Sequence, residues 1–160
     1  MPDVFCLLNH KLTPRQEAEL RNKFCADRIK YPPPEITEKW SKIPTDRELT
    51  GACLEPFTGW LEEAAEGDIA ALQGEFSATF TLADFSLRKG LIPVCAVTER
   101  VAQEEREGEI VHRKYIFEHI CFRRYRYYDE LTMEENHEKP VSKARSGDVI
   151  CADKSLYSAG

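Results

Sequence analysis

Apolar residues follow two alternating patterns along this chain. Short, almost uninterrupted apolar runs are typical of strands covered on both faces, and they occupy residues 4–8, 69–72 and 91–97. Apolar residues spaced three or four positions apart predict helices, at residues 13–24, 35–43, 54–65 and from 75 onward. A short strand is expected at residues 28–31, just before three prolines. We therefore expect an α/β fold with a mostly parallel sheet flanked by helices.

Two of the predicted helices carry signals at their ends. Thr13, Pro14 and Gln16 are of the types expected at an N-cap, a first helical turn and a capping box. The helix after Gly74 is expected to close at Lys89-Gly90. Its apolar residues form two neighbouring stripes, so we expect it to be buried around most of its circumference. The stripes are Phe76, Phe80, Ala83 and Leu87, and Ala78, Leu82 and Phe85.

The second half of the chain changes in character. Thr98-Glu99-Arg100 is expected as the loop that ends the strand at 91–97. Residues 101–106 and 109–116 flank Glu107-Gly108 and predict a twisted β-hairpin, which a strand or short connection at 117–122 follows. From residue 129 the chain becomes polar. We expect a domain at 1–128 and a polar, mobile or loosely docked C-terminal tail at 129–160.

Composition and charge restrict the classes of function. With 160 residues, 42% of them hydrophobic, the chain is sized for one core. Its net charge of -6 argues against a partner such as long DNA or RNA, because neutralising many phosphates needs a surplus of Lys and Arg. No apolar run is long enough to span a membrane and no signal-peptide pattern opens the chain, so we expect a cytoplasmic protein.

The cysteines do not predict a metal site or a cofactor. All 6 are widely spaced, with no CxxC pair. Cys6, Cys95 and Cys121 interrupt apolar runs and are expected as buried thiols rather than nucleophiles. The hydrolase patterns GxSxG and HExxH and the Walker sequence are absent, which argues against those reactions.

A candidate anion site lies where the strand at 69–72 meets the next helix. Such a turn directs unpaired backbone N–H groups and the positive end of the helix dipole at one point. Gln73, Ser77 and Thr79 add side-chain donors, and Gly74 permits a tight turn. Phosphate is the usual anion at such a turn. The alternative is an ordinary turn between strand and helix that binds nothing.

Three predicted loops follow parallel strands, and the carboxyl ends of such strands share one edge of the sheet. We expect Asn9-His10-Lys11, the turn at 73–79 and Thr98-Glu99-Arg100 to converge there. Their amide, imidazole, hydroxyl and guanidinium groups suit ribose, adenine and phosphate. His10 and His119 are candidates for proton transfer, and the alternative for each is a structural hydrogen-bonding group.

A basic, aromatic cluster follows the predicted hairpin turn. It consists of His112-Arg113-Lys114, His119 and Arg123-Arg124-Tyr125-Arg126. Arginine pairs with phosphate through two hydrogen bonds and tyrosine offers a stacking face for bases. The alternative is a solvated edge strand whose charges prevent aggregation.

Four blocks between residues 4 and 128 resemble the small stand-alone Csx-type CRISPR-associated proteins of type III systems, which are regarded as ring nucleases. The Gln-Gly and Phe-Arg-Arg-Tyr blocks are the more specific ones, and Ser77 departs from the pattern, which has a glycine there. The blocks are Asn9-His10; Gly67-Asp68 with Leu72-Gln73-Gly74-Glu75-Phe76-Ser77-Ala78-Thr79; Gly90-Leu91-Ile92-Pro93-Val94 with Thr98-Glu99-Arg100; and Phe117-Glu118-His119 with Phe122-Arg123-Arg124-Tyr125.

The resemblance implies a Rossmann-like domain related to CARF sensors, usually a homodimer, that binds cyclic oligoadenylate and opens the ring to end antiviral signalling. Cyclic tetra-adenylate is the expected ligand. Metal-free opening has the ribose 2′-OH attack the adjacent phosphorus, so groups are needed to align the attack, stabilise negative charge and move protons.

The site residues expected for this chemistry come from the residue types. Arg100 and Arg123 are assigned to charge stabilisation, and His10 or His119 to proton transfer. Ligand contacts are assigned to Asn9, Gln73, Gly74, Ser77, Thr79, Thr98 and Arg124. Three alternatives stay open: a sensor or sponge that binds the ring without cutting it, a metal-dependent nuclease on longer nucleic acid, and a protein-interaction module.

Overall fold

The computed structural model describes residues 1–135, and the surroundings of side chains for residues 1–131. The rest of the predicted tail, 136–160, lies outside the described residues, as does Cys151. The first residues of that predicted tail are helical, in α5 (Tyr128–Glu135).

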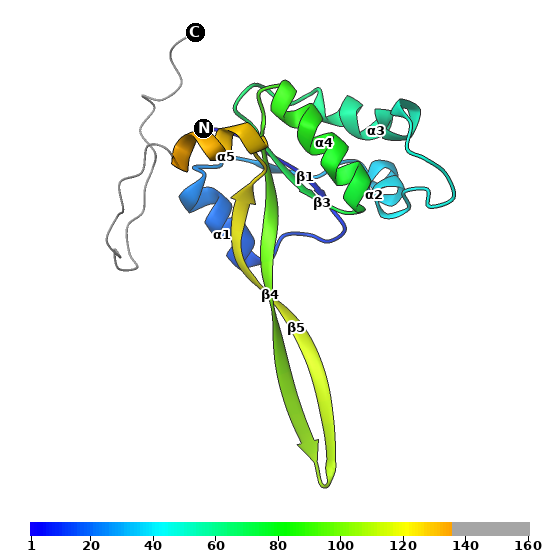
Figure 1. Ribbon diagram of the computed structural model, residues 1–160, viewed down its shortest axis with the longest axis vertical. Helices are drawn as coiled ribbons and strands as arrows, with labels where there is room; N and C mark the ends of the chain where they lie inside the picture. Colours follow the sequence, from blue (N-terminus) through cyan, green and yellow to red (C-terminus); the bar gives the residue numbers. More distant parts are fainter. Residues whose placement is uncertain (136–160) are drawn as a thin grey trace.

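A five-stranded sheet in the order β2-β1-β3-β4-β5 forms the centre of the molecule (Figure 1). The pairs β2/β1, β1/β3 and β3/β4 are parallel, and β4/β5 is antiparallel. The expected α/β fold with a mostly parallel sheet is therefore confirmed. The strands are β1 (Val4–Leu8), β2 (Ile29–Lys30), β3 (Ile69–Gln73), β4 (Ile92–Glu107) and β5 (Ile110–Arg124).

Helices cover both faces of this sheet because neighbouring strand residues point to opposite sides. On one face, Leu20 of α1 belongs to a core cluster with Val4. On the other, Phe5 belongs to a cluster that includes residues of α2, α3 and α4. The helices are α1 (Pro14–Lys23), α2 (Pro34–Ser41), α3 (Gly51–Leu61) and α4 (Phe76–Arg88).

The predicted signals at helix ends are confirmed. The Thr13 side chain accepts a hydrogen bond from the Gln16 backbone N–H, and Gln16 Oε1 accepts one from the Thr13 N–H, which completes the capping box of α1. At the other end of the sheet, α4 stops at Arg88, and Gly90 has a φ of 79°. Glycine adopts this left-handed conformation without the steric cost that other residues meet.

The predicted hairpin is confirmed, but it is much longer than expected. Residues 98–100 continue β4 instead of forming a loop, so that expectation was wrong. Antiparallel pairing with β5 satisfies their backbone groups beyond the point where β3 ends. The register shifts between Val97 and Thr98, which pair with Cys121 and His119, so Ile120 is the extra residue of a β-bulge.

The expectation that α4 is buried around most of its circumference was also wrong. Phe76 is 92% exposed and Phe80 76% exposed. The opposite side of the helix carries Ala78 and Leu82, which are fully buried against the sheet. One of the two apolar stripes forms the core contact, and the first two turns of the other face solvent.

Cys6 lies in the core, as expected. Cys6 is a residue of β1, and its side chain belongs to the core cluster that contains Leu20 of α1. Burial raises the pKa of the thiol to about 12. A thiol with this pKa stays protonated at neutral pH and is a poor nucleophile. Cys95 and Cys121, the other two expected core thiols, are only half-buried.

The turn between β3 and α4 rests on the indole of Trp40. Trp40 is 1% exposed, and its Nε1 donates a hydrogen bond to the Gln73 carbonyl oxygen at 3.1 Å. A Cβ atom added at Gly74 would lie 2.6 Å from two carbons of the indole ring. Gly74 is therefore required by packing, whether or not the turn binds a ligand.

We expect Gly74→Ala to lower the free energy of unfolding by about 1–3 kcal/mol, because a buried ring has no room to move away from the new methyl group. Gly59→Ala is the matched control: it lies in exposed α3 backbone with nothing within 4 Å of the added Cβ. That variant should be stabilised by up to about 1 kcal/mol, since alanine is the better helix former. Urea unfolding of both variants measures the difference, and equal stabilities would contradict the packing role of Gly74.

Candidate functional site

The carboxyl edge of the parallel strands gathers several of the predicted ligand residues. Leu8, the last residue of β1, pairs with Gln73, the last residue of β3. The segments that follow, with exposed Asn9 and His10 and half-buried Gly74, therefore leave the sheet side by side. The strand order places this point between β1 and β3, where the chain switches direction across the sheet. Ligands of open α/β sheets bind at such a point.

A polar cavity of about 480 Å³ opens beside this edge, at the first turn of α4. Its walls are the loop that connects α2 to α3 and the start of α4. Ser77, a predicted ligand residue, lines it, and so does Arg47, which supplies a positive charge. The other lining residues are Pro44, Thr45, Glu48, Leu49, Glu75 and Thr81.

The N-terminus of α4 carries a built-in anion. The Glu75 carboxylate accepts hydrogen bonds from the backbone N–H groups of Ser77 at 3.1 Å and Ala78 at 2.9 Å, and from the Ser77 hydroxyl at 2.6 Å. The Ser77 hydroxyl and these N–H groups hold the pKa of Glu75 below its usual range. A phosphate at this turn would use the same donors, so it would have to displace this carboxylate.

Two predicted ligand residues have buried oxygen atoms without a hydrogen-bond partner within the described part of the chain. They are Gln73 Oε1, at the end of β3, and Thr79 Oγ1, in the second turn of α4. A buried oxygen left unpaired costs about 1–3 kcal/mol. Unpaired polar atoms on both sides of one turn are the kind of defect that a bound polar ligand corrects.

The predicted arginines do not join this cavity within one chain. Arg100 lies on the hairpin, exposed, with its guanidinium carbon 3.6 Å from the centre of the Tyr115 ring. Arg123 and Arg124 pair with Cys95 and Val94 near the start of β4, away from the carboxyl ends of the parallel strands. Thr98 lies beyond the end of β3, at the base of the hairpin.

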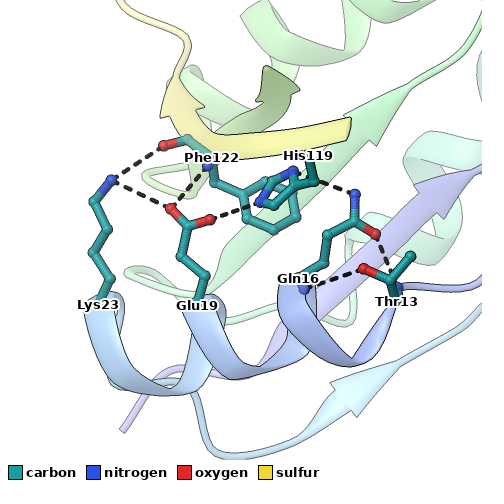
Figure 2. A network of polar contacts seen from close by, with 6 residues as sticks. All are labelled: Thr13, Gln16, Glu19, Lys23, His119 and Phe122. Atoms are coloured by element: carbon teal, nitrogen blue, oxygen red, sulfur yellow. Dashed lines mark hydrogen bonds and ion pairs between the residues drawn. The ribbon is translucent and has the colours of Figure 1, made fainter. Parts of the chain in front are cut away.

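His119 lies in a buried polar network between β5 and α1 (Figure 2). It is 8% exposed, and its Nε2 is 2.7 Å from Glu19 Oε2. Its Nδ1 is 3.5 Å from Gln16 Nε2, whose own Oε1 accepts the Thr13 N–H of the capping box. A neutral imidazole with its proton on Nε2 satisfies both contacts, as donor to the carboxylate and acceptor from the amide. The structural interpretation of His119 therefore accounts for both of its ring nitrogens.

Glu19 is the centre of this network. Its Oε1 accepts hydrogen bonds from the Phe122 backbone N–H at 2.9 Å and from Lys23 Nζ at 3.3 Å. Its other oxygen, Oε2, makes the contact with His119. Burial alone raises the pKa of the Glu19 carboxyl. The donated hydrogen bonds outweigh that effect, so its pKa lies below the usual value of 4.5. One ionised carboxylate thus fastens α1 to β5, the returning strand of the hairpin.

The basic cluster on the hairpin faces acidic partners. Arg113 Nε donates a hydrogen bond to Glu104 across the ribbon at 2.9 Å. His112 pairs with Glu105 in the strand register, next to this ion pair. Cross-strand charge pairing stabilises a ribbon of this kind, so this arrangement fits the solvated-edge alternative better than a phosphate site.

Sequence reasoning missed three residues of this region. Glu75 was placed only within the turn, although its position directly before the predicted helix is one from which a side chain can cap the helix N-terminus. Arg47 lies in a segment with no apolar period, and only the folded chain brings it to α4. Glu19 is one of many acidic residues on helix surfaces, and its contact with His119 joins positions 100 residues apart.

Within residues 1–131, no three His, Cys, Asp or Glu side chains lie close enough together to hold a metal ion. No helix in the described part of the chain is long and apolar enough to cross a membrane.

Comparisons with known proteins identify relatives without an assigned activity. The model of the Uncharacterized protein MJ1673 family matches residues 2–123, which comprise the helices from α1 to α4 and all of the sheet except its last residue, Arg124. "Uncharacterized protein MJ1673" of Methanocaldococcus jannaschii is 36% identical over 130 residues, which cover 80% of this chain and 100% of that protein. No solved structure matches this chain significantly.

We expect Glu19→Gln to lower the free energy of unfolding at pH 7 by about 2 kcal/mol, because hydrogen bonds to a charged group are lost. The pKa of Glu19 is lowered by folding, so its contribution is present above pH 4.5 and is lost as the pH falls through the lower, folded value. The difference between wild type and variant should therefore shrink in acid.

Glu38→Gln is the control, since it removes an exposed ion pair with Lys42 on α2. Chemical denaturation at several pH values measures both variants. A Glu19→Gln protein as stable as Glu38→Gln at pH 7 would show that the network does not fasten α1 to β5.

Proposed function

This chain belongs to the Uncharacterized protein MJ1673 family, and we propose that it binds cyclic oligoadenylate and opens the ring without a metal ion. Cyclic tetra-adenylate is the proposed substrate, and ending type III CRISPR antiviral signalling is the proposed role. The proposal combines the resemblance to Csx-type ring nucleases with the site at the carboxyl edge of the sheet.

The polar cavity at the start of α4 is the observation that carries the proposal. It opens at the first turn of α4, which directly follows β3, and β3 is one of the two strands that flank the switch point where a nucleotide binds in an open α/β sheet. It contains Ser77 from the Gln-Gly block and adds Arg47, whose planar guanidinium can pair with a phosphate. Arg47 is at present paired with its neighbour Asp46 on the surface, so it can turn to a ligand at little cost.

Proton transfer is assigned to His10 rather than to His119. His10 is exposed on the loop that leaves the same edge of the sheet, whereas both ring nitrogens of His119 have partners in the buried network. A general base must come within hydrogen-bond distance of the proton that it removes. Only an accessible imidazole meets that condition for a ligand in the cavity.

The proposed reaction conserves atoms and needs no water. The ribose 2′ oxygen forms a bond to the adjacent phosphorus while the bond from phosphorus to the 5′ oxygen breaks. Neutral His10 accepts the 2′-OH proton and returns it to the leaving 5′ oxygen. The product is linear, with a 2′,3′-cyclic phosphate at one end and a 5′-OH at the other. Arginine stabilises the added negative charge of the pentavalent phosphorus.

A homodimer completes the proposal. Cyclic tetra-adenylate has two-fold symmetry, so a pair of chains related by a two-fold axis can place the same edge loops against each half of the ring. The ligand groups assigned to each half are Asn9, Gln73, Gly74, Ser77 and Thr79.

We expect the purified protein to convert cyclic tetra-adenylate to the linear 2′,3′-cyclic phosphate product equally well with and without EDTA. His10→Ala should slow single-turnover cleavage about 10²-fold or more while ring binding persists, because only proton transfer is lost. Added imidazole should restore part of the rate, which it could not do if His10 only supported the fold. Liquid chromatography with mass spectrometry identifies the products.

Each contrary result selects another function. An intact ring that binds tightly would identify a sensor or sponge. Cleavage that requires added Mg²⁺ or Mn²⁺ would identify a metal-dependent nuclease. A protein that neither binds nor cleaves the ring would show that cyclic tetra-adenylate is not its ligand.

A further inference from the structure

The outer part of the β4-β5 hairpin, residues 98–119, extends away from the domain as a two-stranded arm (Figure 1). Among the described strands, only β5 pairs with β4 along the arm, because β3 ends before the arm begins. An isolated two-stranded ribbon is marginally stable in water. A long arm of this kind gains stability when another surface covers it.

The arm carries apolar side chains that no described element covers. Phe117 is 69% exposed and Tyr115 46% exposed, and both are large aromatic residues. Ile110 and Val111 at the tip are also exposed. Natural ribbons that remain solvated carry charged residues at such positions, so this arm combines charged pairs with a surface suited to docking.

A second apolar surface lies at the start of α4. Phe76 and Phe80 are one helical turn apart and expose 92% and 76% of their surface. We call these two residues the α4 patch. Because α4 starts directly after the carboxyl end of β3, the patch and the base of the arm belong to the same edge of the sheet.

We propose that the arm of each chain docks on the α4 patch of a second copy, and that it brings Arg100 to the partner's cavity. The Arg100 part of this inference rests on the proposed function, whereas the docking contact does not. A two-fold axis at the carboxyl edge lets both chains make the contact at once, each giving an arm and receiving one.

The dimensions and the buried area suit a second copy. The ten residues from 98 to 107 span about 33 Å, and the 13 residues of α4 span about 20 Å. The arm is therefore long enough to lie along the whole of α4 in a second copy. Covering the exposed parts of Phe76, Phe80, Tyr115 and Phe117 in two equivalent contacts buries about 1,000 Å². Val111, which shares the face of Tyr115 and Phe117, extends this toward the roughly 1,200 Å² of a stable specific interface.

The charges next to the two surfaces are complementary. Arg100 is the cross-strand neighbour of Phe117, and Glu75 directly precedes Phe76. Docking Phe117 on the α4 patch therefore brings an arginine toward the carboxylate that caps α4. That pairing would draw Glu75 away from the N–H groups that a phosphate needs, while it adds a guanidinium beside the cavity.

The position of Arg100 favours action in the partner's site over its own. Thr98 pairs with His119, which contacts α1, and Arg100 is two residues further along on the same side of the ribbon. The cavity, in contrast, lies at α4, on the opposite face of the sheet. A second copy removes this separation.

The first test measures the mass of the full-length protein by light scattering after size-exclusion chromatography. Wild type should be a pair of 18.4 kDa chains. Phe117→Asp and Phe76→Asp should each weaken dimerisation at least about 100-fold, since both place a charge in an apolar contact that occurs twice. An acidic residue in the first turn of a helix is favourable, so Phe76→Asp should keep its fold, and circular dichroism checks this.

Tyr128→Asp is the matched control, because it changes an aromatic residue that is 78% exposed but lies on α5, outside both surfaces. It should leave the dimer unchanged. A monomeric wild type would overturn the proposal. So would a dimer that only one of Phe117→Asp and Phe76→Asp disrupts, since that pattern means arm against arm or helix against helix.

The second test mixes His10→Ala with Arg100→Ala, each inactive alone on cyclic tetra-adenylate. If Arg100 acts in the partner's site, each mixed dimer has one complete site, and the mixture should recover about a quarter of wild-type activity. If both residues serve the same chain, no site is complete and no activity returns, which overturns the assignment of Arg100. Should wild type itself leave the ring intact, the proposed function fails while the mass measurement still decides the docking contact.

Discussion

The Glu19 carboxylate is the interaction on which the position of the hairpin depends. Among the strands of residues 1–135, β5 is the one that runs antiparallel to its neighbour, and it lies at the edge of the sheet, where it pairs with β4 on one side. Glu19 binds the β5 backbone at Phe122 and the side chain of His119, on either side of the bulge at Ile120. The bulge increases the local twist, and the carboxylate fixes α1 against it. Together with the Gln16 contact to His119, this carboxylate holds the base of the arm against α1.

The opposite face of the sheet is organised around Trp40. Its buried indole holds the β3-α4 turn by a hydrogen bond to Gln73 and by contact with Gly74. The β3-α4 turn positions Ser77 at the cavity, and it orients α4 so that Phe76 and Phe80 point away from the core. Trp40 on one face of the sheet thus holds the β3-α4 turn, and Glu19 on the other face holds the base of the arm.

Local patterns in the sequence predicted the elements well, because they report on short-range physics. The capping box at Thr13 and Gln16, the apolar run at Val4–Leu8 and the Gly108 turn all depend on neighbours within a few residues. Two predictions failed where the outcome depended on distant partners. Nothing near Thr98 shows that β5 will return to pair with it, and nothing near Phe76 shows that only one side of its helix meets the sheet.

The site was predicted in part for the same reason. Parallel strands bring their carboxyl ends together whatever their exact bounds, so the segment that begins at Asn9 leaves the sheet beside Gln73. Arg47 and Glu75 take part through tertiary contacts and a cap, and Arg100 is carried away from the edge because β4 continues. Residue type led to a proposed chemistry, but the path of the chain decides which side chains can share a ligand.

Hydrogen exchange with bound ligand tests the central claim most directly. The ligand is a cyclic tetra-deoxyadenylate, which lacks the attacking 2′-OH and stays intact. A site at the carboxyl edge that the partner's arm completes predicts slower amide exchange at residues 9–12 and 73–79 and along the arm at 98–119, with the amino ends of β1 and β3 unchanged. Unchanged exchange at 73–79 in the presence of saturating ligand, or protection confined to another part of the chain, would contradict it.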